Sequence, residues 1–558
     1  MTSDTARTGP AGGRRAGLDP TRRLCTLFAE ALELDHVTPD TDFFLAGGHS
    51  LSALALAVSA EESFGVRVRV RDVVEAATPQ LLAARLAELS PAAVKSTAPG
   101  HPPAAAPPDV PTPGSSPPGA PVADSTRWLW LERQRADGDS GAYTVPCLLH
   151  GEGPVDPGRL SAALAALAGR HPALRTRFVE AWGEPRAVLT DDEPPFEVVD
   201  LGARQPSEAR LDALVDDRIS VPFDPATDPL VRATLFLRTG GRWSLLLLAD
   251  HLVCDGRSLE ILARQLVTAY ADPSSCGTRR DGDAVSRRPS GVRPADPEAA
   301  LAHWRSVLTP PPAPLPLPVS GPRTQPAGAA TAVAAQEIGP DVLRQLTHLG
   351  RRHHAGPFAP LAAAVARTLA GLTGSTDICL GTPVDRRALL GAEDAVGFHV
   401  ATVPLRLDVR DGMSADDLVH HVARRTVDAV DHSEVAFDTL VAALDPPRPP
   451  GRTPFFDVWV ALYPHIDTGP CPPGGITLSG GPTPLRVGMF ELSFQFVEHA
   501  DGMRLVLQYD TRRYAPDTAE RMVQRLTDEV VRLLRDPAEP APEAEPAQRA
   551  FGGFQFDV

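Results

Sequence analysis

Two patterns of apolar residues recur along the chain: short unbroken apolar runs, and apolar residues at helical spacing. Both meet around the stretch WSLLLLADHLVCDGRS, Trp243 to Ser258. It begins with a short apolar run, which predicts a strand buried on both faces. A loop with several ionisable residues comes next, and the apolar residues of SLEILARQLVTAYA then recur at helical spacing. A strand that leads into a polar loop and a helix holds side chains rigidly at the end of a sheet, so this loop is the first candidate for chemistry.

Helical spacing of apolar residues also marks residues 17–90, which are predicted to form a small helical domain. LDPTRRLCTLFAEALEL and LSALALAVSAEESFG each predict a helix, and TPQLLAARLAEL predicts a third with Thr78 as N-cap and Pro79 at N1. Before the second helix, DFFLAGGHSL places two phenylalanines in a loop and Ser50 at the helix N-terminus. The N–H groups and dipole there favour a phosphate, whereas the plainer interpretation makes Ser50 an ordinary N-cap.

The remainder of the chain divides by composition. Residues 91–123 are rich in proline and alanine and predict an extended linker. Residues 124–535 mix predicted strands with amphipathic helices, which indicates an α/β architecture. The two ends, 1–16 and 536–558, lack a core-forming pattern and are predicted to be disordered. The closing FGGFQFDV is interpreted either as a docking peptide or as a remnant.

Charge and cysteine content exclude several classes of protein. The net charge is −16 and no basic run is present, which argues against nucleic-acid binding. No apolar segment approaches the ~18 residues of a membrane span, and the first residues lack the apolar part of a secretory signal. The six cysteines are scattered without a CxxC pair or a histidine at metal spacing. We therefore expect reduced thiols, no metal site and a cytoplasmic location.

The central loop carries the candidate chemistry. His251 is the side chain best suited to proton transfer near neutral pH, and it lies between Asp250 and the pair Asp255–Gly256. Taken alone, HxxxDG is more typical of a buried, hydrogen-bonded histidine followed by a turn. Cys254 could act as a nucleophile, but its apolar neighbours favour inert packing.

The segment DFFLAGGHSL, followed by a helix in a unit of this size, closely resembles the carrier (thiolation) domains of nonribosomal peptide synthetases. The resemblance implies that Ser50 bears a covalent 4′-phosphopantetheine arm whose thiol carries an aminoacyl or peptidyl thioester. It also implies a phosphopantetheinyl transferase as the partner that attaches the arm. The linker of residues 91–123 would keep this carrier close to the next domain without fixing one pose.

Residues 124–535 resemble the condensation domains of the same synthetases over essentially their whole length. Four of the motifs that carry the resemblance are RHPALRTRF, DHLVCDG, VGFHVATVPLR and RTPFFDV, in the order that the family has them. The family fold consists of two chloramphenicol-acetyltransferase-like halves that form a V with a tunnel between them, and we place these halves at 124–295 and 296–535. The expected fold class is therefore multidomain, with a small all-α four-helix carrier domain followed by an α/β condensation domain.

The resemblance also implies a reaction and the roles of several residues. An acyl thioester donor would be attacked by the amine of an acceptor, giving an amide one unit longer. His251 matches the essential second histidine of the family motif. Asp255 is expected to pair with Arg387 and so hold the loop. Gly256 would offer an N–H group and room for the substrate, and Ser258 is expected to cap the helix.

The sequence departs from the family pattern in three places, and these departures leave alternatives open. Asp250 stands where the family has its first histidine, and with Asp255 and Ser258 it satisfies DxxxxDxxS, the mark of heterocyclisation domains. His399 and Ala401 replace an aromatic residue and an asparagine, which would alter the tunnel wall. The alternatives to amide formation are ester formation, heterocyclisation, and a non-catalytic recruitment platform of the same fold.

The sequence also bears on the partners. It contains neither an adenylation signature nor a GxSxG thioesterase motif. We therefore expect the Ser50 arm to supply the donor in cis after an adenylation enzyme has loaded it in trans. The acceptor would arrive on another carrier protein or as a free amine or alcohol. The remaining candidates are assigned to packing or to the surface: His171, His353, His354, His432 and Glu434.

Overall fold

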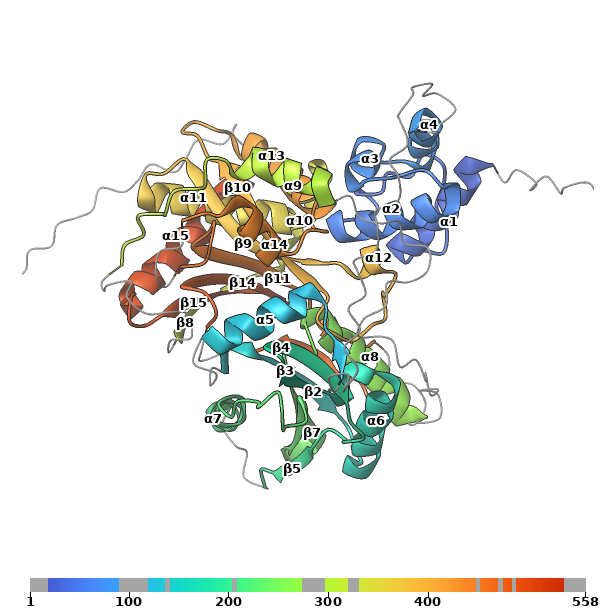
Figure 1. Cartoon of the computed structure of the whole chain (residues 1–558), viewed down its shortest axis with the longest axis vertical. Helices are drawn as coiled ribbons and strands as arrows, with labels where there is room; N and C mark the ends of the chain where they lie inside the picture. Colours follow the sequence, from blue (N-terminus) through green and yellow to red (C-terminus); the bar gives the residue numbers. More distant parts are fainter. Residues whose placement is uncertain are drawn as a thin grey trace, which may run out of the picture.

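The computed structural model describes residues 19–89, 119–135, 141–202, 208–272, 297–319, 331–447, 452–469, 475–483 and 488–535. These residues form a helical N-terminal domain and an α/β region of two subdomains, each built on a six-stranded sheet (Figure 1). Both predicted disordered ends, and the predicted linker up to residue 118, lie outside the described residues.

The helical domain contains the three predicted helices and one that the spacing did not reveal. Its elements are α1 (Pro20–Leu32), α2 (Ser50–Phe64), α3 (Val70–Glu75) and α4 (Pro79–Leu89). Asp19 caps α1, with Pro20 at N1. Phe28, Phe43 and Phe44 have no exposed surface and form edge-to-face ring contacts in the core. The helix α3 was missed because six residues are too few to show a 3.6-residue period.

The first subdomain is a sheet with helices packed against it. The strand order is β12-β13-β2-β7-β6-β5, and the central strand β7 is flanked by antiparallel partners on both sides. The apolar run predicted to be a buried strand lies in β7, where residues 243–250 are all buried. The elements of this subdomain are β2 (Thr144–Glu152), α6 (Pro157–Arg170), β5 (Phe196–Asp200), α7 (Glu208–Ile219), β6 (Val231–Leu237), β7 (Arg242–Asp250) and α8 (Gly256–Ala271).

The second subdomain has the strand order β10-β9-β11-β14-β15-β8. Helices α10, α11, α13 and α15 bury their apolar sides with this sheet in one core. Its strands are β8 (Thr331–Ile338), β9 (Asp377–Asp385), β10 (Val400–Asp408), β11 (Val458–Tyr463), β14 (Leu492–His499) and β15 (Gly502–Asp510). Its helices are α9 (Pro297–Leu308), α10 (Pro340–Arg352), α11 (Phe358–Thr373), α12 (Arg387–Leu390), α13 (Ala415–Asp431), α14 (Phe437–Leu444) and α15 (Pro516–Leu534).

Two features amend the division predicted from sequence. The strands β12 (Ile466–Asp467) and β13 (Ser479–Pro482) come from the second half of the chain but extend the sheet of the first subdomain, because β13 pairs with β2. The end of the predicted linker is also structured, since β1 (Ala120–Pro121) pairs with β4 (Glu184–Leu189) in a small sheet that includes β3 (Thr176–Ala181). The helix α5 (Asp124–Arg135) then follows.

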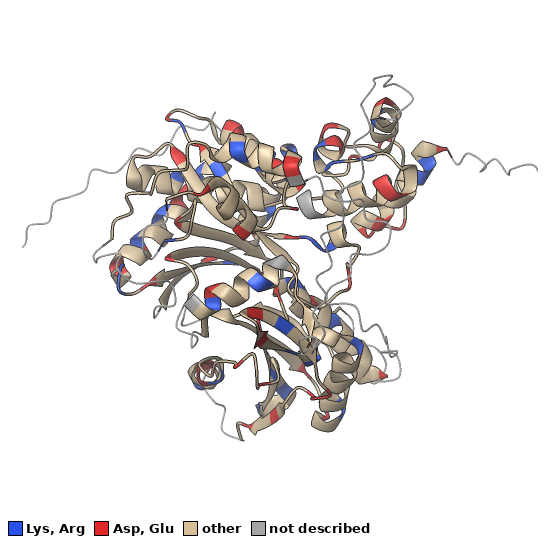
Figure 2. Ribbon diagram, viewed as in Figure 1, with Lys and Arg blue, Asp and Glu red and all other residues tan. Residues whose placement is uncertain are grey.

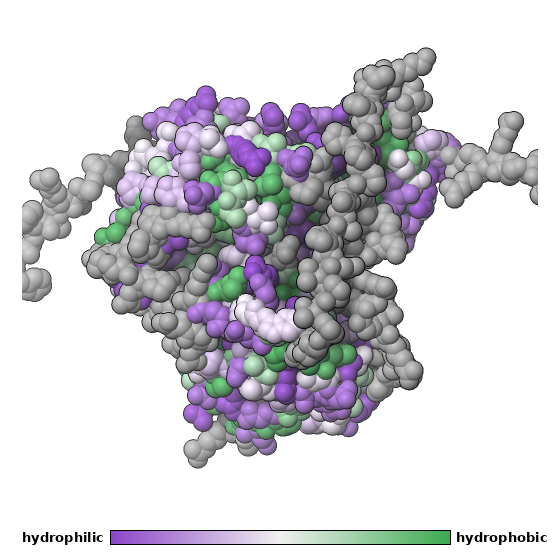
Figure 3. Space-filling view, viewed as in Figure 1, coloured by the Kyte–Doolittle hydropathy of each residue, from purple (hydrophilic) through white to green (hydrophobic). Residues whose placement is uncertain are grey.

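The helical domain packs on the second subdomain beside α12 and α13 (Figure 1). The apolar residues of both form one contiguous buried cluster. On the face shown in Figure 3, apolar residues gather around α14, near the middle of the molecule. Acidic and basic residues are interspersed over the helices in Figure 2. Among the described residues, no helix is both long and apolar enough for a bilayer span.

Candidate active site and carrier junction

His251 lies immediately after the last residue of β7. Its backbone N–H donates to the carbonyl of Tyr143 at 2.8 Å, and its ring makes an edge-to-face contact with Phe398 at 5.1 Å. Its Nδ1 lies 2.8 Å from the carbonyl oxygen of Cys254. A carbonyl only accepts, so Nδ1 carries the hydrogen and Nε2 keeps a lone pair in the neutral ring. The loop thus holds the imidazole in the tautomer that can accept a proton at Nε2.

Asp255 ends the loop and is buried without exposed surface. Its carboxylate accepts two hydrogen bonds from the Arg387 guanidinium, at 2.9 and 3.0 Å. It also accepts from the backbone N–H groups of Ser258, at 2.8 Å, and His399, at 3.0 Å. Burial alone would raise the pKa of Asp255, but Arg387 and these N–H groups outweigh it and lower the pKa. Asp255 is therefore held as an anion.

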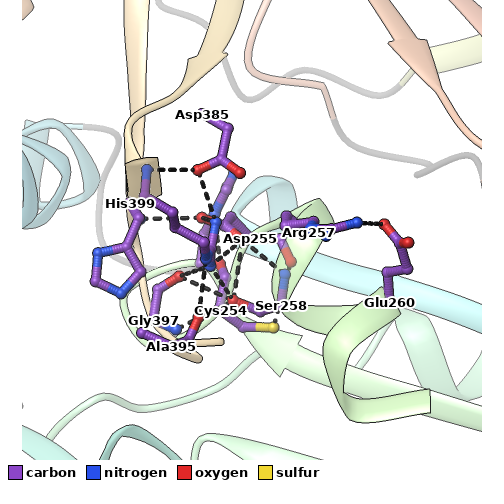
Figure 4. Close-up of polar contacts among 11 residues, drawn as sticks. Cys254, Asp255, Arg257, Ser258, Glu260, Asp385, Ala395, Gly397 and His399 are labelled. Carbon is purple, nitrogen blue, oxygen red and sulfur yellow. Dashed lines mark hydrogen bonds and ion pairs between the residues drawn. The ribbon is translucent and has the colours of Figure 1, made fainter. Parts of the chain in front are cut away.

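The same network joins the two subdomains. Asp255 caps α8 in the first subdomain, whereas Arg387 begins α12 in the second. Ser258 Oγ accepts from Arg387 at 2.8 Å and from the N–H of Gly397 at 3.1 Å. Figure 4 shows Asp255, Ser258 and Gly397 in this arrangement. The expectation that Ser258 caps the helix is wrong, because Asp255 accepts the N–H of Ser258 and is the cap.

Asp250 is paired with a residue that the sequence reading missed. Arg133, on α5, donates to the Asp250 carboxylate, and the two side chains are 4% and 0% exposed. Burial raises the pKa of Asp250, although Arg133 and the N–H of Leu252 act in the opposite direction. The available signal was spacing, because Arg133 follows the buried Leu129 by one helical turn and so lies on the buried side of α5.

Three other residues in or near the loop, Cys254, Gly256 and His399, are buried or lie in contact with neighbouring residues. Burial raises the pKa of the Cys254 thiol well above its usual value, which makes it a poor nucleophile. A side chain at Gly256 would meet the ring of Tyr463 at 3.7 Å, an ordinary contact distance. The ring of His399 covers Gly397, where an added Cβ would lie 2.7 Å from Nε2 of His399. The ring of His399 therefore packs against Gly397.

The loop before α2 depends on two glycines. Gly47 has φ +116°, a value that L-residues rarely adopt. A Cβ on Gly48 would lie 2.3 Å from the Phe43 ring, so only glycine fits there. The N-cap of α2 is His49, whose Nδ1 accepts the N–H of Ser52 at 3.3 Å. Ser50 is therefore the first residue of the helix, and the plainer interpretation of Ser50 as an N-cap is wrong.

The first turn of α2 lies at the junction with the condensation-like region. His49 lies beside Gly356, where an added Cβ would be 3.1 Å from the His49 Cβ. Desolvation lowers the pKa of His49, and the nearby guanidinium of Arg257, at the start of α8, lowers it further. Ser50 is the first residue of this 15-residue helix, and the free N–H groups and dipole of a helix N-terminus favour a phosphate. The residues present fit a phosphopantetheine group.

Two further contacts fix the helical domain on the second subdomain. The ring of Phe44 packs edge-to-face on His354 at 5.3 Å. The carboxylate of Asp431, at the end of α13, accepts the backbone N–H groups of Val70, at 2.7 Å, and Arg71, at 3.2 Å. An acid of one domain thus satisfies the first N–H groups of α3 in the other.

Three of the remaining candidate histidines have side-chain partners of their own. No group of three or more metal-ligating side chains occurs among the described residues. His353 pairs with Asp416 at 2.9 Å, and His171 contacts the Gln265 side chain at 2.6 Å. His432 stacks on His303 with ring centroids 3.7 Å apart.

Comparison with known families finds one family in the helical domain and a second family in the α/β region. The family model of the phosphopantetheine attachment site matches residues 22–86, and that of the condensation domain matches residues 127–550. The first match contains Ser50, and the second contains the His251 loop and Arg387.

Three similar curated proteins are a probable non-canonical nonribosomal peptide synthetase, CymA, a phosphinothricin tripeptide synthetase and a dimodular nonribosomal peptide synthase. The chain is 33% identical to CymA of Salinispora arenicola over 94% of its own length, and it covers 7% of that protein. It is 31% identical to the phosphinothricin tripeptide synthetase PhsB of Streptomyces viridochromogenes, over 88% of this chain and 41% of PhsB. The dimodular nonribosomal peptide synthase of Bacillus subtilis is 29% identical over 94% of this chain, which spans 22% of it. The chain thus spans less than half the length of each of these relatives.

Solved structures share the fold. The first condensation domain of the calcium-dependent antibiotic synthetase superposes with a TM-score of 0.63 at 22% identity, over 75% of this chain and 97% of that one. The X-domain from teicoplanin biosynthesis gives 0.62 at 20% identity, over 76% and 97%.

Proposed function

The chain belongs to the condensation-domain family of nonribosomal peptide synthetases and carries a phosphopantetheine attachment domain before it, and from this premise we propose that it forms amide bonds. The domain at residues 22–86 is the attachment site, and Ser50 is the residue that we propose to carry the arm. The donor is then presented in cis, and the acceptor amine is supplied in trans by another carrier protein or as a free molecule.

The geometry of His251 carries the proposal. The Cys254 carbonyl fixes the hydrogen on Nδ1, and the network of Asp255 and Arg387 fixes the far end of the loop. The Nε2 lone pair of His251 is thus available to accept the proton that the attacking amine loses. When bound, the phosphopantetheine group supplies a thiol that holds the acyl unit as a reactive thioester.

The packing of the helical domain supports a donor presented in cis. The first turn of α2, where Ser50 begins the helix, contacts the second subdomain through His49 and Gly356. The positive charge of Arg257, the second residue of α8, lowers the pKa of His49 and so acts on the residue next to Ser50. Alignment of two reactants can lower a barrier by about 7–11 kcal/mol, so a carrier docked here contributes more than proton transfer alone.

The alternatives receive less support. Asp250 has no exposed surface and is paired with Arg133, so the DxxxxDxxS match does not place a free carboxylate in the site. One similar structure is a complex of the teicoplanin X-domain with OxyB, and a platform of that kind needs no oriented base. The held tautomer of His251 favours catalysis over such a role. Ester formation differs only in the acceptor and stays an alternative.

The test is a single-turnover condensation assay on the intact protein. A pantetheinyl transferase converts it to the holo form, a donor is loaded, and candidate amines are offered while intact mass reports the carrier. We expect His251→Ala to slow product formation roughly 10²–10⁴-fold, the usual contribution of a general base.

His348→Ala is the matched control, because His348 is an exposed histidine on α10. It should react at the wild-type rate. Ser50→Ala should accept no arm and give no product. Product that forms equally fast without His251, or product that loses water from a Cys, Ser or Thr unit, contradicts amide formation at this site.

A further inference from the structure

Arg133 and Asp250 form a buried ion pair directly behind the His251 loop. Arg133 is 4% exposed and Asp250 has no exposed surface. One amino group of Arg133 donates to the Asp250 carboxylate, and the other donates to the carbonyl of Phe223. Removing two opposite charges from water is tolerated only while they remain paired, so each residue depends on the other.

Asp250 also shapes the loop. One carboxylate oxygen accepts the N–H of Leu252 at 2.9 Å, and its backbone carbonyl accepts the N–H of Val253 at 3.0 Å. Side chain and backbone together close a tight turn, as Asp residues do at such positions. The turn brings Nδ1 of His251 to the carbonyl of Cys254. The orientation of the imidazole therefore depends on where the Asp250 carboxylate is held.

A neutral side chain could close the same turn. His49 demonstrates this in the same chain, because its Nδ1 accepts the N–H of Ser52. A neutral imidazole at position 250 would need no cation behind it, whereas a buried carboxylate does. The buried carboxylate at position 250 therefore needs the guanidinium at position 133, and the buried guanidinium needs the carboxylate.

We propose that Arg133 is a positioning residue for the His251 loop, holding the Asp250 carboxylate that closes the turn. A residue of α5, outside the loop, thereby fixes the orientation of the His251 ring. The inference rests on the proposed function, because it assigns Arg133 a part in the same proton transfer.

The main test removes both charges at once in the variant R133M/D250N. Asparagine keeps an oxygen for the N–H of Leu252, and methionine fills much of the arginine volume, so no buried ion is left unpaired. We expect an unfolding temperature within a few degrees of wild type, an unchanged KM for the acceptor, and a kcat lower by on the order of 10- to 100-fold, because the turn is no longer anchored. The variant R133Q/D250H, with an imidazole to close the turn, should recover much of that kcat.

A remote buried pair provides the matched control. Arg513 and Glu491 are 4% and 7% exposed and form an ion pair in the second subdomain. R513M/E491Q should change stability by a similar amount and leave kcat unchanged. The proposal is overturned if R133M/D250N has the wild-type kcat, or if the control loses as much activity.

Hydrogen exchange tests the same point without activity. The N–H of Leu252 should exchange faster in R133M than in wild type, because the carboxylate that accepts it is no longer held. Equal exchange would overturn the positioning role. A wild-type protein that makes no His251-dependent product would instead contradict the proposed function, and the exchange measurement would still decide the role of Arg133.

Discussion

Two buried carboxylates, Asp250 and Asp255, flank the His251 loop, and they differ in their partners rather than in their burial. Neither has exposed surface. Asp250 has one guanidinium and one backbone N–H, and its pKa is raised. Asp255 has a bidentate guanidinium and two backbone N–H groups, and its pKa is lowered. The number and geometry of donors thus decide whether a buried acid is well stabilised as an anion.

The two acids also differ in what they connect. Asp250 and its partner Arg133 both belong to the first subdomain. Asp255 reaches across to Arg387 and His399 in the second subdomain. Loss of Asp255 should therefore affect the relative placement of the subdomains, whereas loss of Asp250 should affect only the local turn.

The largest effect is expected from Asp255→Ala. It removes the α8 cap and leaves the Arg387 guanidinium buried with one fewer anionic partner, a change that costs about 3–5 kcal/mol for a buried pair. We expect a large fall in the unfolding temperature and loss of condensation, measured by calorimetry and by the single-turnover assay. Asp255→Asn keeps part of the cap and should lose less. Normal activity in Asp255→Ala would contradict the role of this network.

Asp250→Asn should have a smaller effect on stability at neutral pH and a distinct effect on its pH dependence. Because the folded-state pKa of Asp250 is raised, its favourable contribution is present in full below its unfolded pKa of about 3.8 and is lost as pH rises through the folded pKa. Asp250→Asn lacks that contribution, so its unfolding free energy should fall more steeply than that of wild type on acidification from pH 7.

Asp255→Asn should show the opposite trend. Its stabilising contribution is present above about pH 3.8 and is lost as pH falls through the lowered folded pKa, so the variant should be less sensitive to acid than wild type. Denaturant unfolding at a series of pH values measures both slopes. Parallel slopes in the two variants would contradict the contrast between the acids.

Ser258→Ala should have an intermediate effect. It removes the hydroxyl that accepts hydrogen bonds from Arg387 and Gly397 and donates one to Asp255. The other hydrogen bonds that Asp255 accepts remain. A buried hydrogen-bonding group of this kind is worth about 1–3 kcal/mol when its partners are left unsatisfied. Chemical denaturation should show that loss with a smaller fall in kcat than Asp255→Ala. Ser258→Cys, which keeps a weak donor, serves as the control.

The smallest effect is expected at Asp431, an acid that accepts two backbone N–H groups at the carrier junction. Desolvation raises its pKa to about 6, although both N–H groups oppose the shift. Its contribution to docking is therefore largest below about pH 3.8 and is lost as pH rises through about 6. Energy transfer between dyes at positions 34 and 531 should report tighter docking at pH 5 than at pH 7.

The matched variant at that position is Asp431→Asn, which keeps an acceptor oxygen but does not titrate. It should remove the pH dependence between 5 and 7 while leaving the domain docked. Asp431→Ala should weaken docking roughly fivefold, the effect of ~1 kcal/mol. An unchanged pH dependence in Asp431→Asn would assign the titration to another group.

The local order of elements followed from the chain alone. The apolar run of β7, the loop after it and the helical spacing of α8 are properties of neighbouring residues, so periodicity was sufficient to find them. The motif around Ser50 and the division into a helical domain and an α/β region are likewise patterns of neighbouring residues, and the family matches agree with both. Short elements such as α3 were missed because they contain less than two periods.

Only the tertiary structure decided which distant residues meet. Arg133 reaches Asp250 across 117 positions, and Asp431 reaches Val70 across 361. Strand β13, from the second half of the chain, pairs with β2 of the first sheet. Such pairing requires a free sheet edge and does not require that the two strands be close along the chain. A charged residue carries no local sign of its partner, because the partner is set by the packing of helices and sheets that hydrophobic burial brings together.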